Sequence, residues 1–408
     1  MDDLEKLKSE FDLKELQLQA LLEVTQAINE NLPEKSLYKI FEFTLRVNLR
    51  FSGLALFVNE YNWDLKSSFG IKNSELESEP PVHHVNLVAP TFVDGIENPF
   101  FDQFNWVIPV RHKENLLALL YIRDSTIVRE GDASEGVFSF TQTLANLLLV
   151  AIENKKLARK ELKRQAMKRE LEIARDVQHY LFPDELRHDD KVIMNAFYLP
   201  HTNVGGDYYD YIPTCNDHQF IFCIADVSGK GVPAALLMSN FQAALRTLVR
   251  RTTDLEEIVN DLNLHIFQSA NGQNFITFFI GLVDLVKNKL TYVNCGHNPP
   301  MIIKGKEVTF LDKGTTLLGA FEELPFLNHG KIEGIKESYL FTYTDGLVEA
   351  RNNNDEEMGI ERVREIITEN MKYTPDVVHG VLMNYLDRFR ESQRFPDDIT
   401  LLSIKFNK

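Results

Sequence analysis

The chain has 408 residues and a net charge of −16. Its length suits two or three domains, and its 44% apolar residues are enough for packed cores. The acidic balance argues against a nucleic-acid binder, which would present a basic face, although carboxylates are natural ligands of divalent cations.

The cysteines and the apolar runs bear on the compartment. Cys215, Cys223 and Cys295 fit no zinc-binding spacing and no disulfide framework, which indicates a reducing compartment. The N-terminal stretch MDDLEKLKSE is charged, unlike a signal peptide, and apolar runs such as LANLLLVAI are too short to span a bilayer. We therefore expect a cytoplasmic protein without a transmembrane segment.

The first segment, residues 1–32, contains neither glycine nor proline and predicts one N-terminal helix. Its apolar residues recur at a 3–4 spacing and include Leu4, Leu7, Phe11, Leu18, Leu21 and Ile28. Such a stripe is typical of a coiled-coil seam between two copies of a chain, and it also fits an amphipathic helix packed on its own domain.

Residues 33–152 predict a second segment, an α/β or α+β domain with an antiparallel sheet. LYKIFEFTLRVNL reads as a helix, and GLALFVNE, WDLKSSFGI, NWVIPVRH and NLLALLYIRD read as short strands. The segment has no cysteine and no catalytic pattern. The pair His83–His84 is a weak candidate for a metal contact, and a solvated loop pair is the alternative.

A long helix follows, because no glycine or proline occurs between Val137 and Phe182. Residues 151–182 hold nine Lys/Arg and five Asp/Glu, a net charge of +4 within an acidic chain. We expect a helical, coiled-coil-like linker over residues 153–185. The residues predicted to form its short seam are Met167, Leu171, Ala174, Gln178 and Leu181.

Residues 186–408 read as an α+β domain of many strands and two helices. Four aspartate-bearing turns, each next to an apolar β-type run, punctuate it: GGDYYD, CIADVSGKG, LFTYTDGLVEA and FPDDITLLSI. Each turn alone is an ordinary hairpin or loop signal. Together they place rigidly held carboxylates at strand ends, where they can converge on Mg²⁺ or Mn²⁺.

These motifs carry a resemblance to a known family. ELEIARDVQHYLFP, GGDYYD, ADVSGKGVPAALLMS, TYVNCGHNPP, FTYTDGLVEARN, MGIERV and DDITLLSIK occur in this order between Glu170 and Lys405. The region resembles the PPM (PP2C-like) metal-dependent serine/threonine phosphatases, of the bacterial branch that regulates sigma factors and sporulation. The resemblance implies an α-β-β-α sandwich with two Mn²⁺ or Mg²⁺ ions at one edge.

The resemblance also implies roles for single residues. Asp226 would bridge both ions, Asp207 and the Val227 carbonyl would complete the shell of one ion, and Asp345 and Asp397 would hold the other. The family pattern favours Asp397 over its neighbour, Asp398, and leaves that neighbour as the alternative. A water between the ions would attack phosphorus in line, without a covalent intermediate.

Three further residues stand in the same motifs. Asp210, Lys230 and His297 are candidates for supporting a metal ligand or contacting substrate, and a buried, turn-stabilising role is the alternative for His297. Eukaryotic relatives bind the substrate phosphate with an arginine, for which this chain shows no clear match.

The N-terminal region is similar to a GAF domain, because LLEVTQAINENLPEKSLYKIFEFTL followed by GLALFVNE gives the usual opening of a helix and then a strand. A PAS domain is the alternative, and the ligand stays open. The expected whole is an α+β multidomain protein with a GAF-like sensor, a helical linker and a PP2C-like α-β-β-α sandwich over residues 186–408.

The resemblance implies a sensor-regulated protein serine/threonine phosphatase that forms a homodimer through its N-terminal and linker helices. The expected substrate is a phosphoserine-carrying anti-sigma-factor antagonist with a STAS domain. The alternative from another functional class is a catalytically silent scaffold of the same fold. The aspartates of the metal motifs are all present, which favours the enzyme.

Overall fold

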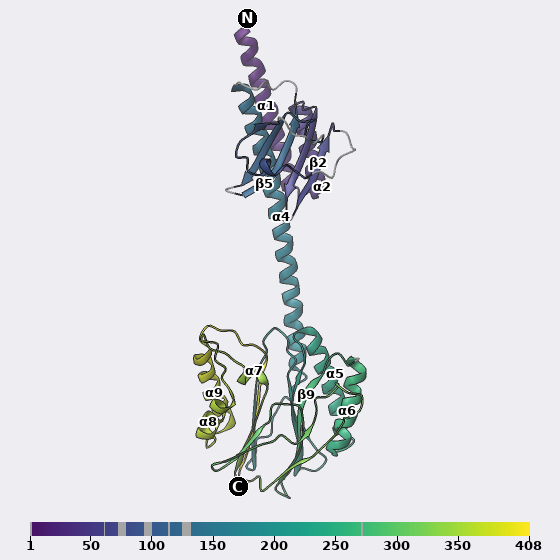
Figure 1. The fold of residues 1–408 in the computed structure, drawn as a ribbon, viewed down its shortest axis with the longest axis vertical. Helices are drawn as coiled ribbons and strands as arrows, with labels where there is room; N and C mark the ends of the chain where they lie inside the picture. Colours follow the sequence, from purple (N-terminus) through teal and green to yellow (C-terminus); the bar gives the residue numbers. More distant parts are fainter. Residues whose placement is uncertain are drawn as a thin grey trace. The chain divides into compact units, whose positions relative to one another are not determined.

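The computed structural model describes residues 2–60, 62–71, 79–93, 100–112, 115–124, 132–270 and 272–408. The chain divides into two compact units, residues 1–165 and 166–408 (Figure 1). The helix α4 runs through the division between them.

The first unit is one sheet with helices. Its helices are α1 (Asp2–Asn29), α2 (Glu34–Asn48), the short α3 (Val82–Val85) and the first part of α4 (Asp132–His179). Its strands are β1 (Gly53–Asn59), β2 (Trp63–Phe69), β3 (Thr91–Phe92), β4 (Trp106–His112) and β5 (Asn115–Arg123). They form an antiparallel sheet in the order β2-β1-β5-β4-β3.

The two faces of this sheet bury different partners because strand side chains alternate. On one face Leu54 and Leu56 of β1 pack with residues of α1, α2 and α4. On the other face Phe57 and Tyr121 pack with Phe100 and Phe101 in an aromatic cluster. His84 of α3 is buried there and shares a 2.8 Å hydrogen bond with the Tyr121 hydroxyl. The pair His83–His84 therefore lies in a helical turn, and His84 serves this core.

The apolar stripe predicted along residues 1–32 divides into two groups in the structure. Leu21 and Ile28 pack against the core of the first unit, beside the buried Val24. Phe11 and Leu18 are 67% and 60% exposed. The side chains of Leu4 and Leu7 lie outside the described residues. The helix thus lies on its own domain and also keeps an exposed apolar stripe.

The helix α4 covers Asp132–His179, so it begins before the predicted 137–182 range and ends three residues earlier. Among the described residues it is the one helix long and apolar enough, by length and composition, to cross a membrane. Leu144, Leu148 and Ile152 of its apolar stretch are buried in the core of the first unit. Packing in that core accounts for the apolar stretch.

The second unit holds two sheets and several helices. Its helices after α4 are α5 (Val232–Val249), α6 (Leu255–Ala270), α7 (Asp345–Val348), α8 (Ile360–Asn370) and α9 (Pro375–Arg390). A six-stranded sheet has the order β13-β10-β9-β8-β7, with β14 paired to β10, and a five-stranded sheet has the order β12-β11-β15-β16-β6.

The strands of the six-stranded sheet are β7 (Tyr208–Pro213), β8 (Gln219–Val227), β9 (Ile276–Asp284), β10 (Lys289–Cys295), β13 (Gly314–Thr315) and β14 (Gly330–Glu333). Those of the five-stranded sheet are β6 (Val192–Leu199), β11 (Met301–Lys304), β12 (Glu307–Phe310), β15 (Ser338–Tyr343) and β16 (Ile399–Phe406).

Three hydrophobic cores separate four layers. Residues of α5 and α6 pack on the six-stranded sheet, the two sheets pack on each other through residues such as Phe222 and Leu402, and α8 and α9 pack on the five-stranded sheet. Figure 1 shows the two helix pairs on opposite sides of the sheets. The unit is an α-β-β-α sandwich, and both sheets end at the edge where the aspartate turns lie.

The prediction of two helices in this region was wrong, because the structure has four long helices there. Val363 and Ile367 of α8, and Val378, Leu382 and Leu386 of α9, are buried at the 3–4 spacing of amphipathic helices. Each helix has only one apolar stripe, which is a weaker signal than the continuous apolar runs of the buried strands.

Candidate active site

Two of the predicted aspartates lie side by side on the six-stranded sheet. Asp207 precedes β7, and Asp226 is the second-last residue of β8. The antiparallel register pairs Tyr208 with Ala225, so one further step places Asp207 opposite Asp226. The two carboxyl groups are close enough that each affects the pKa of the other.

The other aspartates come from the five-stranded sheet. Asp345 follows β15, and Asp397 and Asp398 precede β16. These strands are antiparallel with Tyr343 opposite Leu401, so the end of β15 and the start of β16 share one edge. We call Asp207, Asp226, Asp345, Asp397 and Asp398 the sheet-edge carboxylates.

Two buried threonines join the edges of the two sheets. Thr344 Oγ1 and Thr400 Oγ1 both donate to Asp207 Oδ2, at 2.8 and 2.5 Å. Thr400 N in turn donates to Thr344 Oγ1 at 2.8 Å. Asp207, which stands on the first sheet, is therefore held by hydroxyls of the second sheet. A hydroxyl donating to a carboxylate stabilises its charged form.

The backbone at and near the Gly205–Gly206 loop is hydrogen-bonded to the Asp398 carboxylate. His201 N donates to Asp398 Oδ1 at 2.6 Å, and Gly206 N donates to Asp398 Oδ2 at 2.7 Å. A Cβ atom on Gly205 would lie 2.3 Å from Asp398 Oδ2, so only glycine permits this approach. A Cβ atom on Gly206 would lie 3.0 Å from the Val227 carbonyl oxygen, which places that carbonyl beside the loop.

Burial, followed by mutual repulsion, raises the pKa values of the carboxyl groups at this site. Burial and the neighbouring Asp226 and Asp398 hold the pKa of Asp207 well above its usual range. Burial and Asp345 raise the pKa of Asp226 to about 7. Burial, Glu349 and Asp397 raise the pKa of Asp345 to about 6. Carboxylates that repel one another in a half-buried place are stabilised by a cation.

One protein cation reaches the cluster. Lys230 Nζ lies 2.7 Å from Asp397 Oδ2 and also donates to the Pro396 carbonyl. Lys230 is half exposed, and its positive charge lowers the pKa of Asp345 only as a minor contribution. A single lysine does not balance five carboxyl groups.

Asp397 and Asp398 have different hydrogen-bond and ion-pair partners. Both carboxylate oxygens of Asp398 accept backbone N–H groups, and its side chain is buried. Asp397 is bound by Lys230 and by the N–H of the next residue, and it is 31% exposed. Asp398 is thus committed to the loop, whereas Asp397 is the accessible carboxylate.

The carboxylates do not yet form a coordination shell. Over the described part of the chain, no three His, Cys, Asp or Glu side chains are close enough to hold a metal ion as they stand. Residue type, burial and mutual repulsion nevertheless fit hard divalent cations, which bind carboxylate and carbonyl oxygens.

Asp210 and His297 have other surroundings. Asp210 is fully buried and ion-paired with Arg246 of α5, at 2.7 and 3.0 Å. His297 is buried, with Nδ1 2.9 Å from Thr277 Oγ1, and its backbone is held by Asn294. Burial lowers the pKa of His297 to about 4, so the ring is neutral at pH 7 and offers no positive charge to a phosphate.

The sequence patterns did not single out Thr344, Thr400 or Arg246, and they placed Gln178 in a helical seam instead of at this site. Thr344 directly precedes Asp345, and Thr400 follows Asp398 by two residues, so both stood within quoted motifs. Their side chains act across the gap between the sheets, a long-range contact that spacing along one strand does not reveal.

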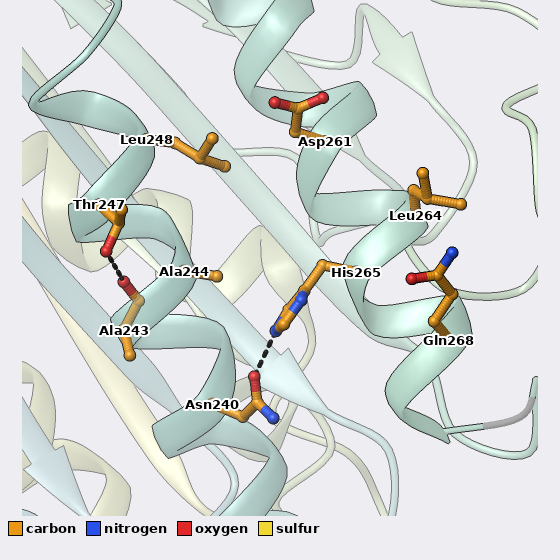
Figure 2. A pocket seen from close by; sticks show the side chains of 9 residues that line it. All are labelled: Asn240, Ala243, Ala244, Thr247, Leu248, Asp261, Leu264, His265 and Gln268. Atoms are coloured by element: carbon orange, nitrogen blue, oxygen red, sulfur yellow. Dashed lines mark hydrogen bonds between the residues drawn. The ribbon is translucent and has the colours of Figure 1, made fainter.

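A separate groove lies between α5 and α6 (Figure 2). It has a volume of about 550 Å³ and is lined by residues such as Ala243, Leu248 and His265. None of the sheet-edge carboxylates lines it. The chemistry-bearing residues and this groove are thus different places on the second unit.

Comparisons with known proteins agree with this architecture. Residues 216–407 match the family described as stage II sporulation protein E (SpoIIE). The phosphoserine phosphatase RsbU of Bacillus subtilis is 29% identical over 250 residues, which cover 59% of this chain and 71% of RsbU. The phosphoserine phosphatase RsbP of the same organism is 26% identical over 188 residues, which cover 45% of this chain and 46% of RsbP.

Among solved structures, the SiaA-PP2C domain of Pseudomonas aeruginosa superposes with a TM-score of 0.54 at 18% identity. The superposition covers 60% of this chain and 98% of that domain. At this identity the likeness establishes the fold, and the second unit has the PP2C-like α+β architecture.

Proposed function

Residues 216–407 belong to the SpoIIE family of PP2C-type phosphatase domains, homologous to RsbU and RsbP, and from this premise we propose that the chain is a metal-dependent protein serine/threonine phosphatase. The observation that carries the proposal is the set of sheet-edge carboxylates. These five carboxyl groups gather where two sheets end, and burial together with repulsion from Asp345 raises the pKa of Asp226 to about 7.

PP2C-type phosphatases are metal-dependent, and two Mn²⁺ or Mg²⁺ ions supply Lewis acidity for hydrolysis of a phosphate ester. The residues of this chain that would hold them are Asp207, Asp226, Asp345, Asp397 and the Val227 carbonyl. Asp398 contributes by fixing the Gly205–Gly206 loop, and it is the alternative ligand.

The residues around the carboxylates have defined tasks. Thr344 and Thr400 hold Asp207 in one orientation by donating two hydrogen bonds to a single oxygen. Lys230 neutralises Asp397 in this structure, and its half-exposed ammonium is free to turn toward a phosphate once Asp397 is engaged elsewhere. By analogy with PP2C-type phosphatases, water attacks phosphorus and no covalent intermediate forms.

The relatives support a proposal for the substrate class. RsbU and RsbP are both phosphoserine phosphatases. By analogy the substrate here is a serine-phosphorylated regulator of a sigma factor, of the STAS-domain anti-sigma-factor-antagonist type, and the place of action is the cytoplasm.

The first unit is proposed to be a GAF-like sensor, with PAS as the alternative. Support comes from its antiparallel sheet, which has helices on one face and an aromatic cluster on the other. Exposed apolar residues at Phe11, Leu18 and Leu22 of α1, together with Leu162 and Met167 of α4, support a homodimer through these helices. Light scattering at tens of micromolar should then give twice the chain mass.

Hydrolysis of p-nitrophenyl phosphate tests the enzymatic proposal. We expect turnover with millimolar Mn²⁺ and none with EDTA, because sites built from carboxylates and waters bind such ions weakly. The variant Asp217→Asn, which alters an exposed loop carboxylate, serves as the control. Full activity in EDTA contradicts the proposal.

A further inference from the structure

Gln178 has an unusual position at the end of α4. It is 5% exposed, whereas its neighbours Val177 and Tyr180 are 58% and 78% exposed. The sequence pattern placed Gln178 in a helical seam. The structure turns its amide inward, toward the Gly205–Gly206 loop of the same unit.

The amide of Gln178 binds both polar groups of one residue. Gln178 Nε2 donates to the Gly205 carbonyl at 2.8 Å, and Gly205 N donates to Gln178 Oε1 at 3.3 Å. A side-chain amide offers both a donor and an acceptor, and here each is used on the same backbone unit. The contact is buried, so losing it leaves unpaired polar groups without water to replace the amide.

The other side of the loop is bound to the carboxylates. Gly206 N donates to Asp398 Oδ2, and the following residue, Asp207, receives the hydroxyls of Thr344 and Thr400. A Cβ atom on Gly205 would lie 2.2 Å from the Tyr198 hydroxyl, so the loop has no free space on that side. The short segment Gly205–Asp207 is therefore clamped between α4 and the sheet edge.

The end of α4 is itself fixed to the second unit. Gln242 Nε2 of α5 donates to the Leu181 carbonyl at 3.2 Å. The Phe182 ring lies 4.9 Å from the ring of Tyr198 and 5.0 Å from that of Tyr209, measured between centroids. Gln178 thus acts from an anchored position, which a side chain must have if it is to orient a loop.

We propose that Gln178 is a positioning residue for the cation site: its amide holds the Gly205–Asp207 segment so that Asp207 faces Asp226. The inference rests on the proposed metal-dependent function. Gln178 lies on a helix, away from the carboxylates in the sequence. It would set the affinity for the cation without contacting the cation.

The variant Gln178→Met in the full chain tests the inference, since Met keeps the length and the helix propensity but forms neither hydrogen bond. We expect Mn²⁺ binding, measured by calorimetry, to weaken about 10-fold, which corresponds to about 1.4 kcal/mol. At saturating Mn²⁺ the turnover number should stay within about 3-fold of wild type, because the ligands themselves are intact.

Amide hydrogen exchange in EDTA gives a second readout that needs neither metal nor activity. The Gly205 and Gly206 amides should exchange about 10-fold faster in Gln178→Met, because the first loses its acceptor and the second loses its support. Gln165→Met is the matched control. It makes the same chemical change at an exposed glutamine of the same helix, whose amide donates to Glu161, and it should leave both quantities near the wild-type values.

Unchanged exchange and Mn²⁺ affinity in a folded Gln178→Met protein overturn the inference, as does equal weakening by Gln165→Met. If the methionine variant does not fold, Gln178→Asn, whose amide is one methylene short of Gly205, carries the same expectations. A wild-type protein that binds Mn²⁺ but hydrolyses no phosphate ester contradicts the proposed function and leaves the comparison of the two variants intact.

Discussion

The six-stranded sheet buries carboxylates in two places and treats them differently. Asp210 of β7 is fully buried, and Arg246 of α5 meets it with two hydrogen bonds of 2.7 and 3.0 Å. Asp226 of the neighbouring strand β8 is surrounded mainly by other carboxyl groups, and its pKa rises to about 7. A buried carboxylate that is ion-paired with an arginine has a structural role. Carboxylates that lie close together without enough positive side chains form a binding site for an external cation.

Among the substitutions that test this difference between Asp210 and Asp226, the largest expected effect is on catalysis. Asp226→Asn removes the charge at the centre of the sheet-edge carboxylates, so turnover with saturating Mn²⁺ should fall about 10²-fold or more. Steady-state hydrolysis of p-nitrophenyl phosphate measures it. Activity within 3-fold of wild type removes Asp226 from the proposed site.

The next-largest effect concerns the contribution of the Asp210–Arg246 ion pair to the free energy of unfolding. Arg246→Met leaves Asp210 buried without its cation and should lower the free energy of unfolding by about 2–3 kcal/mol. Fully buried pairs typically lose about 3–5 kcal/mol, and the smaller figure allows for water reaching the guanidinium, which is 36% exposed. Urea denaturation in EDTA measures the change. An unaffected midpoint shows that Asp210 does not need Arg246.

At the sheet edge we expect a substitution to raise the free energy of unfolding instead of lowering it. In EDTA at pH 7.5, Asp226→Asn should raise the free energy of unfolding by about 1–2 kcal/mol, because it removes a charge that burial and repulsion from Asp345 disfavour, as the rise of the Asp226 pKa from 3.8 to about 7 shows. A metal-free variant less stable than wild type contradicts the electrostatic account of the site.

The same pKa predicts a pH dependence of the metal-free protein. Between about pH 4 and pH 7 the folded wild type keeps a proton on Asp226 that the unfolded chain has lost, so the contribution of this group to stability falls as pH rises. Asp226→Asn should lack this slope. The difference between the two urea midpoints, measured from pH 4.5 to pH 8 in EDTA, isolates the effect from the buried histidines, which titrate in both proteins.

The smallest effect concerns Lys230. Its ammonium competes with a cation for Asp397, so Lys230→Met should tighten Mn²⁺ binding about 2–5-fold by calorimetry. An exposed lysine such as Lys168, changed in the same way, gives the matched control. Weaker binding in Lys230→Met indicates that the lysine supports the ligands instead of competing with them.

The sequence predicted the parts of this site that are local. Asp207, Asp226, Asp345 and Asp397 stand next to strong β-type runs, so their convergence at strand ends followed from short-range patterns and the family resemblance. Thr344 and Thr400 act across two sheets, and Arg246 reaches a strand from a helix. Such contacts depend on how the layers pack, which spacing along the chain does not contain.

Helices on the surface show the same limit. The predicted stripe on α1 divided into buried and exposed residues, because one helix face serves its own domain and the adjoining face does not. Gln178 was placed in a linker seam by its spacing. Only the fold reveals that its amide meets Gly205.

Calorimetric titration of Mn²⁺ into the wild-type protein and Asp226→Asn tests the central claim most directly. The claim is that Lys230 does not balance the charge of the five sheet-edge carboxylates, which therefore bind divalent cations. The account predicts two ions per wild-type chain with dissociation constants up to the millimolar range, and loss of at least one ion in Asp226→Asn. Equal stoichiometry and affinity in the two proteins contradict it.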